Sequence, residues 1–244
     1  MLLRDLLKQS LATSTLECWQ RERTATLTRR FASRSHTRTL RVLGTPVRAF
    51  AVRLHAAGLS LRETEAILHL LGVERSFQAI FQWVHRLADS VSDPPKAQPR
   101  RVAVDETAVK INGKWSWLYA AIDLDTKVIL DVALFERHGT DPAAAFLHGV
   151  CEKHDCSDTV FLADAFGYRT AFSRLGVNGR VDYTERNLIE KWFHTFKMRV
   201  DRFHNSWVGS RLSVRQWLAV FVHYYNFQRP HQSLDGRTPA QEVN

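Results

Sequence analysis

The stretch RVAVDETAVKINGKWSWLYAAIDLDTKVILDVALF, residues 101–135, decides the fold of this chain. Apolar and polar residues alternate through its first part, which is the pattern of a half-buried strand. Asn-Gly at 112–113 is a strong signal for a tight hairpin turn, and Asp-Thr-Lys at 125–127 indicates a second turn. We therefore predict a three-stranded antiparallel meander.

Helices and one further strand follow this meander. TVFLADA, residues 159–165, is short and strongly apolar, as is typical of a buried parallel strand. The predicted elements after the meander are a helix at 141–154 with Asp141 as its cap, this strand, a short helix at 167–175, a turn at 176–180, a long helix at 187–203 and a last helix at 213–227. This order predicts an α/β fold in which helices cover a mixed sheet.

The segment before the meander reads as a small helical unit. In LSLRETEAILHLLGVERSFQAIFQWVHRLADSV, residues 59–91, Ser60 and Glu63 form a capping box and Gly72 ends the first helix. Ser76 can cap a second helix, which outlines a helix-turn-helix. The predicted inward residues are Leu61, Ile67, Leu68, Leu71, Phe77, Ile80, Phe81, Val84 and Leu87. A generic helical hairpin is the alternative.

If the motif binds DNA, its second helix enters the major groove. Its outward residues would be Gln78, Gln82, His85 and Arg86, and Gln and Arg are residues that read base edges. Residues 21–48 are rich in arginine and form either a phosphate-contacting arm or a disordered stretch. The predicted divisions are an N-terminal segment 1–57, the helix-turn-helix 58–91, a proline-rich linker 92–100, a catalytic domain 101–232 and a tail 233–244.

Composition narrows the class of partner. The 244 residues carry a net charge of +9 with a sequence pI near 9.8, which favours a polyanion, nucleic acid first. No run of 18 apolar residues occurs, so we expect no membrane span and a cytoplasmic protein. Cys151, His154 and Cys156 match no strong zinc pattern.

Two aspartates occupy unusual positions. Asp105 interrupts the first strand and Asp164 ends the strand after the meander. A carboxylate in a buried strand is costly unless it is paired or binds a cation. Glu190, on the long helix, supplies a third carboxylate, and three such oxygen ligands suit Mg²⁺ or Mn²⁺. The competing acids are Glu106, Asp123, Asp125, Asp131, Asp182 and Glu185.

Four motifs in order carry a family resemblance. The segments around VDETAVKINGKW (104–115), FLADAFGY (161–168), NLIEKWFHTFK (187–197) and YNFQRPHQSLDGRTP (225–239) resemble the DDE transposases of prokaryotic insertion sequences. The group that they resemble is the insertion-sequence-six family, in particular its haloarchaeal branch. The resemblance covers residues 55 to 244.

This resemblance implies an RNase H-like catalytic domain with a mixed five-stranded sheet, related to retroviral integrase. Asp105, Asp164 and Glu190 match the family's three metal-binding carboxylates, which hold two Mg²⁺ or Mn²⁺ ions, and Lys197 matches a lysine that meets phosphate. Arg229 and His231 in the tail are possible DNA contacts.

The implied function is cleavage and strand transfer of duplex DNA at the element's terminal inverted repeats. A homodimer or higher assembly at the nucleoid is expected. The interval between Asp164 and Glu190 is shorter than is usual in the family, so the alternative is an inactive remnant that only binds DNA.

Overall fold

The meander predicted from residues 101–135 is present in the computed structural model, which describes residues 45–91, 93–164, 166–181, 190, 193, 194, 198, 207 and 209–243. It comprises β1 (Arg101–Ile111), β2 (Lys114–Asp123) and β3 (Ile129–Phe135). Asn112 and Gly113 connect the first two strands with φ of 47° and 77°, the left-handed backbone that a two-residue hairpin requires.

The sheet has five strands in the order β3-β2-β1-β4-β5. β4 (Val160–Ala163) and β5 (Gly179–Val181) run parallel to β1, and β2 is antiparallel to both of its neighbours. The mixed five-stranded sheet is confirmed. Our interpretation of residues 176–180 as a turn alone is wrong at its end, because Gly179 and Arg180 pair with β4. Three residues are too few to show a strand period in the sequence.

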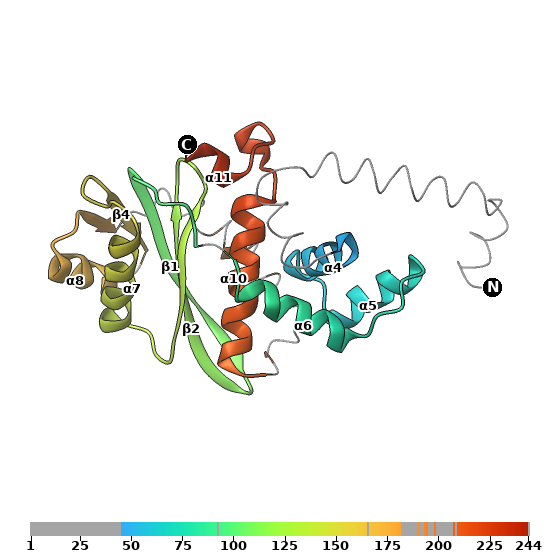
Figure 1. Ribbon diagram of the computed structural model, residues 1–244. Coiled ribbons are helices and arrows are strands. Elements are labelled where there is room, and N and C mark those ends of the chain that lie inside the picture. The colour runs from blue at the N-terminus through green and yellow to red at the C-terminus, as the bar shows by residue number, and fades with distance from the viewer. Residues whose placement is uncertain are drawn as a thin grey trace.

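Helices cover both faces of this sheet (Figure 1). α7 (Thr140–Lys153) and α8 (Phe166–Leu175) lie on one face, and α10 (Arg211–Phe227) lies on the other. Side chains of β1 alternate between the two faces of the sheet. Val102 and Val104 pack toward α7 and α8, whereas Ala103 and Val109 pack toward α10. α7 begins at Thr140 after Gly139, so Asp141 is not its cap; the Asp141 carboxylate instead accepts a hydrogen bond from Arg174 at 2.8 Å.

Between residues 45 and 91, the helical unit has three helices rather than the two that we predicted. α4 (Pro46–Ala56), capped by Thr45, packs with α5 (Leu61–Leu70) and α6 (Phe77–Ala88) in one apolar cluster. The predicted division at residue 58 therefore falls inside this unit. We did not predict α4, because its first residues overlap the arginine-rich stretch 21–48, which shows little apolar periodicity. The α5 capping box is present, with Ser60 and Glu63 bonding each other's backbone N–H.

Two residues predicted to face inward are exposed. Leu71, the C-cap of α5, is 55% exposed because the helix ends before it. Phe81 is 44% exposed, because α6 buries the side defined by Ile80, Trp83 and Leu87. Two residues correspond to about 200° around a helix, so Phe81 lies nearly opposite Trp83.

The predicted linker is attached to the catalytic sheet over its second half. Ala97 and Pro99 are buried. The carbonyl of Ala97 accepts a hydrogen bond from the backbone N–H of Asp155, and the carbonyl of Pro99 accepts one from the Thr159 hydroxyl at 2.6 Å. Residues 97–100 are thus part of the catalytic core.

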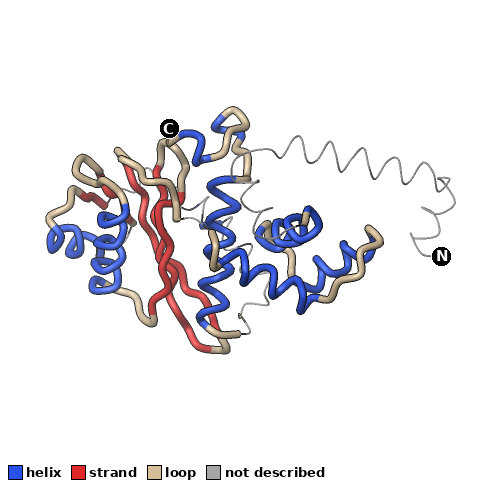
Figure 2. Tube along the Cα trace, viewed as in Figure 1, coloured by secondary structure: helices blue, strands red, loops and turns tan. Residues whose placement is uncertain are grey.

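α10 lies between the sheet and the helical unit, as the tube view shows (Figure 2). Trp217 and Phe221 pack on the sheet, while Val220 packs into the cluster of α4 and α6. The chain then turns through a short 3-10 helix, η1 (Gln232–Leu234), to α11 (Pro239–Glu242), which packs on α10. In the part of the chain that the structure describes, no helix is long and apolar enough to span a membrane.

Candidate active site

Asp105 lies within β1, and Asp164 directly follows β4, the parallel neighbour of β1. β1 and β4 pair as far as Ala103 opposite Leu162, and each aspartate lies two residues further along its strand direction. Neighbouring strands are about 5 Å apart, so the two backbones lie side by side at this end of the sheet. Both side chains are half-buried. The strand register therefore brings together two carboxylates that are 59 residues apart in the sequence.

Glu190 and Phe193 both have helical backbone. Phe193, three residues later, is 2% exposed and belongs to the apolar cluster that includes Ala103, Leu162 and Trp217. Phe193 thus packs on the face of the sheet to which Ala103 belongs, and Asp105 shares the parity of Ala103 along β1. Glu190 itself is exposed. Lys197 lies outside the described residues.

Glu106 occupies the opposite face of β1 from Asp105. Its carboxylate accepts a hydrogen bond of 2.6 Å from the hydroxyl of Tyr168, a buried residue of α8. Burial raises the pKa of the Glu106 carboxyl and the charge of Asp164 raises it further, while the Tyr168 hydrogen bond lowers it. Negative charge is therefore concentrated where β4 ends, beside the middle of β1.

The sequence does not reveal the pairing of Glu106 with Tyr168. The only hint is that the two residues fall in neighbouring motifs, DET and FGY. The pair ties the first turns of α8 to β1, next to the segment that carries Asp164.

Three of the other acidic candidates have structural partners. Asp123 is buried and organises the β2–β3 turn, accepting hydrogen bonds from Asp125 N–H and the Thr126 hydroxyl. Asp125 pairs with Arg101 at 2.6 Å and Asp131 pairs with Lys153 at 2.8 Å. Asp182 and Glu185 lie outside the described residues.

The donor set suits a hard divalent cation. Two half-buried carboxylates next to a third acid repel one another, and a cation with oxygen ligands would relieve that repulsion. Within residues 45–243, among those that the structure describes, no three His, Cys, Asp or Glu side chains lie close enough to hold an ion together. The described side chains of Asp105, Asp164 and Glu190 therefore form no closed ligand set.

Cys151, His154 and Cys156 do not form a metal site. Both ring nitrogens of His154 are engaged: Nδ1 accepts from the backbone N–H of Ala97 at 3.3 Å, and Nε2 donates to the carbonyl of Leu130 at 3.1 Å. His154 is buried, and burial lowers its pKa. The histidine is a neutral structural residue that joins residues 97–100 to β3.

The residues of α6 that we predicted to contact base edges lie on the outer side of this helix. Gln78, Gln82 and Arg86 are exposed and His85 is half-buried. The tail residues differ from them, because Arg229 stacks on the ring of Tyr225 at 5.4 Å and His231 contacts the same ring at 4.7 Å. Burial and the charges of Arg229 and Lys127 lower the pKa of His231 to about 4, so its ring is neutral at pH 7.

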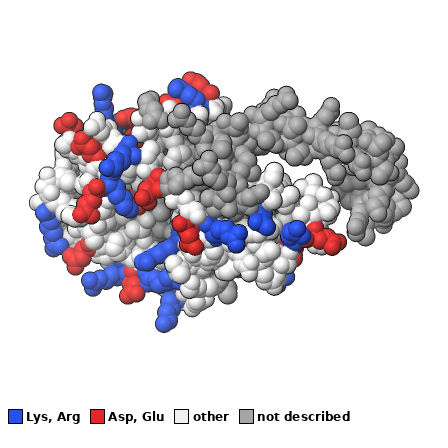
Figure 3. All heavy atoms as spheres, in the orientation of Figure 1, with Lys and Arg blue, Asp and Glu red and all other residues white. Residues whose placement is uncertain are grey.

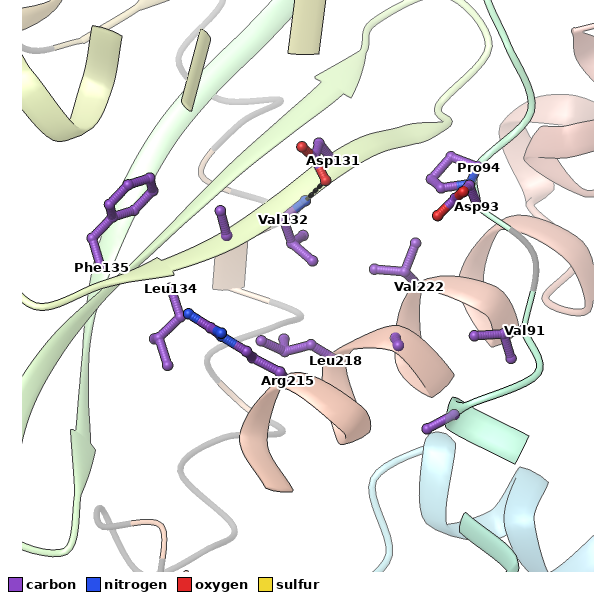
Figure 4. A pocket seen from close by; sticks show the side chains of 13 residues that line it. Val91, Asp93, Pro94, Asp131, Val132, Leu134, Phe135, Arg215, Leu218 and Val222 are labelled. Carbon is purple, nitrogen blue, oxygen red and sulfur yellow. Dashed lines mark hydrogen bonds between the residues drawn. The ribbon is translucent and has the colours of Figure 1, made fainter. Parts of the chain in front are cut away.

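A separate apolar cavity of about 490 Å³ lies away from the carboxylates (Figure 4). Its walls come from residues 88–94, the edge strand β3 and α10, and Val132, Leu218 and Val222 line it. β2 separates β3 from β1, so the cavity is about two strand spacings from Asp105. It is not the site of the carboxylate chemistry.

Comparisons with known proteins identify a matching domain and several sequence relatives. Residues 100–216 match the model of a DDE domain. A transposase of the insertion sequence-like element IS431mec from Staphylococcus aureus is 24% identical over 197 residues, which is 76% of this chain and 87% of the relative. An uncharacterized protein of Methanocaldococcus jannaschii is 23% identical over 184 residues, or 74% of this chain and 86% of that one.

Solved structures of the same general kind were found. The HTLV-2 integrase catalytic core domain in complex with magnesium aligns with a TM-score of 0.38 and 11% identity, over 62% of this chain and all of that one. The catalytic domain of Mos1 mariner transposase gives 0.38 and 17%, over 51% and 74%.

The mixed five-stranded sheet and the match to a DDE domain are what we expect of a polynucleotidyl transferase with an RNase H-like fold. Within that class, the chain is similar to DDE transposases, whose DDE domain it matches over residues 100–216.

Proposed function

We propose that this protein is the transposase of a prokaryotic insertion sequence, which binds the element's terminal inverted repeats, cleaves their strands and joins them to target DNA. The observation that carries the proposal is the register of β1 and β4, which brings Asp105 beside Asp164 on the side where Phe193 anchors the segment of Glu190. The relatives named as transposases support it.

Asp105, Asp164 and Glu190 would hold two Mg²⁺ or Mn²⁺ ions. Such ions, when bound, lower the pKa of an attacking water and stabilise charge on the leaving oxygen. The half-buried aspartates are fixed by their strands, and the exposed side chain of Glu190 would turn toward them to complete the ligand set. Water would attack the phosphodiester at the element end, which leaves a 3′-hydroxyl on the element and a 5′-phosphate on the flanking DNA. The 3′-hydroxyl would then attack a phosphodiester of the target, form the new ester bond and displace a 3′-hydroxyl of the target strand.

The remaining predicted contacts have distinct proposed roles. Gln78, Gln82, His85 and Arg86 on α6 would read the repeat in the major groove. Lys197 would contact phosphate. Arg229 and His231 are held against Tyr225, which favours a structural role over DNA contact. We further propose that two or more copies hold two DNA ends at the nucleoid.

A cleavage assay tests the proposal. Labelled duplex carrying the DNA that flanks the gene is incubated with the full chain and Mg²⁺, Mn²⁺ or EDTA. We expect metal-dependent nicking at the element ends that disappears in Asp105→Asn, Asp164→Asn and Glu190→Gln, with end binding retained. Glu152→Gln, an exposed acid on α7, is the matched control and should cleave as the wild type does. Full activity in Asp105→Asn would refute the assignment.

A second candidate is an inactive remnant that only binds DNA. It is favoured by the absence of a closed three-ligand cluster among the described side chains and by the short interval from Asp164 to Glu190. However, α8 and β5 both fit within that interval. Tight, salt-sensitive binding to the ends without cleavage in either metal would establish this candidate.

A further inference from the structure

The exposed face of α6 contains one residue that the polar pattern does not explain. Phe81 is 44% exposed and lies among Gln78, Gln82 and His85. His85 packs against its ring in an edge-on contact, with centroids 3.9 Å apart and planes at 63°. The ring is therefore supported from one side and open to solvent on another.

The position of Phe81 along α6 matters as much as its exposure. It is the fifth of twelve residues, in the N-terminal half of the helix. In a helix-turn-helix, the N-terminal residues of the recognition helix are those that reach base edges. The side of α6 opposite to Phe81 packs against α10. In Figure 1, α10 lies between the sheet and the helices α4, α5 and α6.

We propose that Phe81 reads a thymine methyl group in the major groove of the element's terminal repeat. The C5-methyl of thymine is the one apolar group that the bases present there, and side chains such as Phe recognise it by contact. The neighbouring amides of Gln78 and Gln82 would hydrogen-bond adenine in the same groove. Phe81 would therefore make the repeat specific for thymine at one position. This inference rests on the proposed function of end binding.

Duplex DNA fits this face better than a second copy of the protein. Gln78 and Gln82 lie next to Phe81 on α6, and Arg86 is exposed on the same helix; these polar side chains would lose water at an apolar protein interface, whereas base edges and phosphates supply partners for them. Three acids of the helical unit are engaged within the protein. Glu63 caps α5, Glu65 accepts from the backbone N–H of Phe77 at 3.2 Å, and Asp89 accepts from Gln216 at 3.3 Å.

The test uses the full chain and thymine-to-uracil replacement, which removes only the methyl group. The wild type first selects its preferred duplex from a randomised library, and each thymine of that duplex is then replaced by deoxyuridine in turn. One buried methyl predicts that a replacement at one thymine weakens wild-type binding about fourfold. Phe81→Ala should bind the thymine and uracil duplexes equally.

Phe50→Ala is the matched control, because Phe50 is a phenylalanine of similar exposure, 41%, on α4. It should keep the wild-type response to uracil. Thermal melting of both variants checks that they are folded.

The outcomes separate this inference from the function on which it rests. If the wild type selects a sequence but no thymine is sensitive to uracil, or Phe81→Ala keeps the sensitivity, the role of Phe81 is refuted and end recognition stands. If Phe81→Ala changes only the mass of the assembly in light scattering, the role of Phe81 in base reading is likewise refuted, and the face is an interface between copies. If the wild type selects no sequence, duplex recognition itself fails.

Discussion

Asn226 joins α10 to the edge strand β3 of the catalytic domain. It is completely buried on α10, and its side-chain amide donates to the carbonyl of Ile129 and accepts from the backbone N–H of the same residue, both at 2.9 Å. Ile129 begins the edge strand β3. A single side chain thus satisfies both backbone groups of a buried strand end and joins it to α10.

Replacing Asn226 by alanine should lower the free energy of unfolding by about 2–5 kcal/mol, because two buried backbone groups each lose a partner at about 1–3 kcal/mol. Urea unfolding measures this. Gln232→Ala, at an exposed position in η1, is the control and should change stability by less than about 0.5 kcal/mol. A loss below about 1 kcal/mol in Asn226→Ala would show that water replaces the amide.

The hydroxyl of Tyr168 has a similar role on the other face. Tyr168→Phe removes the hydrogen bond to Glu106, and a hydrogen bond to a charged group contributes about 1.5–3 kcal/mol. We expect destabilisation of that order in urea unfolding. A double-mutant cycle with Glu106→Gln isolates the pair, and additive effects of the two substitutions would mean that the bond contributes nothing.

At the scale of elements, α5 depends on its first turn. Ser60 and Glu63 satisfy each other's backbone N–H at 3.1 and 2.7 Å. Ser60→Ala should destabilise the helical unit by about 1 kcal/mol, since it removes the N-cap acceptor. Hydrogen exchange of the α5 amides measures this locally. Ser90→Ala, just beyond α6, is the control, and equal protection of α5 in Ser60→Ala and wild type would contradict the prediction.

Side chains also cover hydrogen-bonding groups of the edge strand β3. β3 is an edge strand, and the Val132 N–H bonds to the carboxylate of Asp131, while Arg211 reaches the carbonyl of Leu134 at 3.4 Å. Side chains thus occupy hydrogen-bonding groups that would otherwise be open to another strand.

At the scale of the whole molecule, three histidines link stability to pH. The pKa values of His55, His154 and His231 are all lowered, first by burial, with that of His231 at about 4. Below the ordinary value of 6.5 the unfolded chain takes up protons that the folded chain does not. Stability should therefore be complete above about pH 6.5 and fall as the pH drops toward 4.

Urea midpoints between about pH 7.5 and 4.5 test this dependence. Glu106, whose pKa is raised, acts in the opposite sense, because its folded form takes up a proton first. His154→Gln and His55→Gln should flatten the curve, and a midpoint that rises on acidification would contradict the prediction.

Charge is distributed unevenly along the chain. Basic and acidic side chains are interspersed over the described residues on the face drawn in Figure 3, whereas residues 1–44 are rich in arginine in the sequence. Changing Arg29, Arg30, Arg34 and Arg38 to glutamine should weaken binding to non-specific duplex and make its salt dependence shallower, by about 0.9 in slope for each phosphate that is no longer neutralised. Filter binding between about 50 and 200 mM salt measures this slope. Arg169→Gln on α8 is the control, and an unchanged slope in the arginine variant would contradict the prediction.

The sequence alone determined the elements with a clear period or turn signal. The meander, the Asn112–Gly113 turn, the α5 capping box and the last helix follow from local patterns, and so do the positions of Asp105 and Asp164 along their strands. These features are local, since alternation, capping and turn preferences act over a few residues. The family motifs, four in one order, identified the class.

Tertiary structure decided what depends on neighbours distant in the sequence. β5 exists only because β4 offers it an edge, α4 is held by α5 and α6, and residues 97–100 are held by His154 and Thr159. The exposure of Phe81 depends on which side of α6 the other helices cover. The meeting of Asp105 with Asp164, the pairing of Glu106 with Tyr168 and the contact of Asn226 with Ile129 likewise arise from packing, which short-range propensity does not encode.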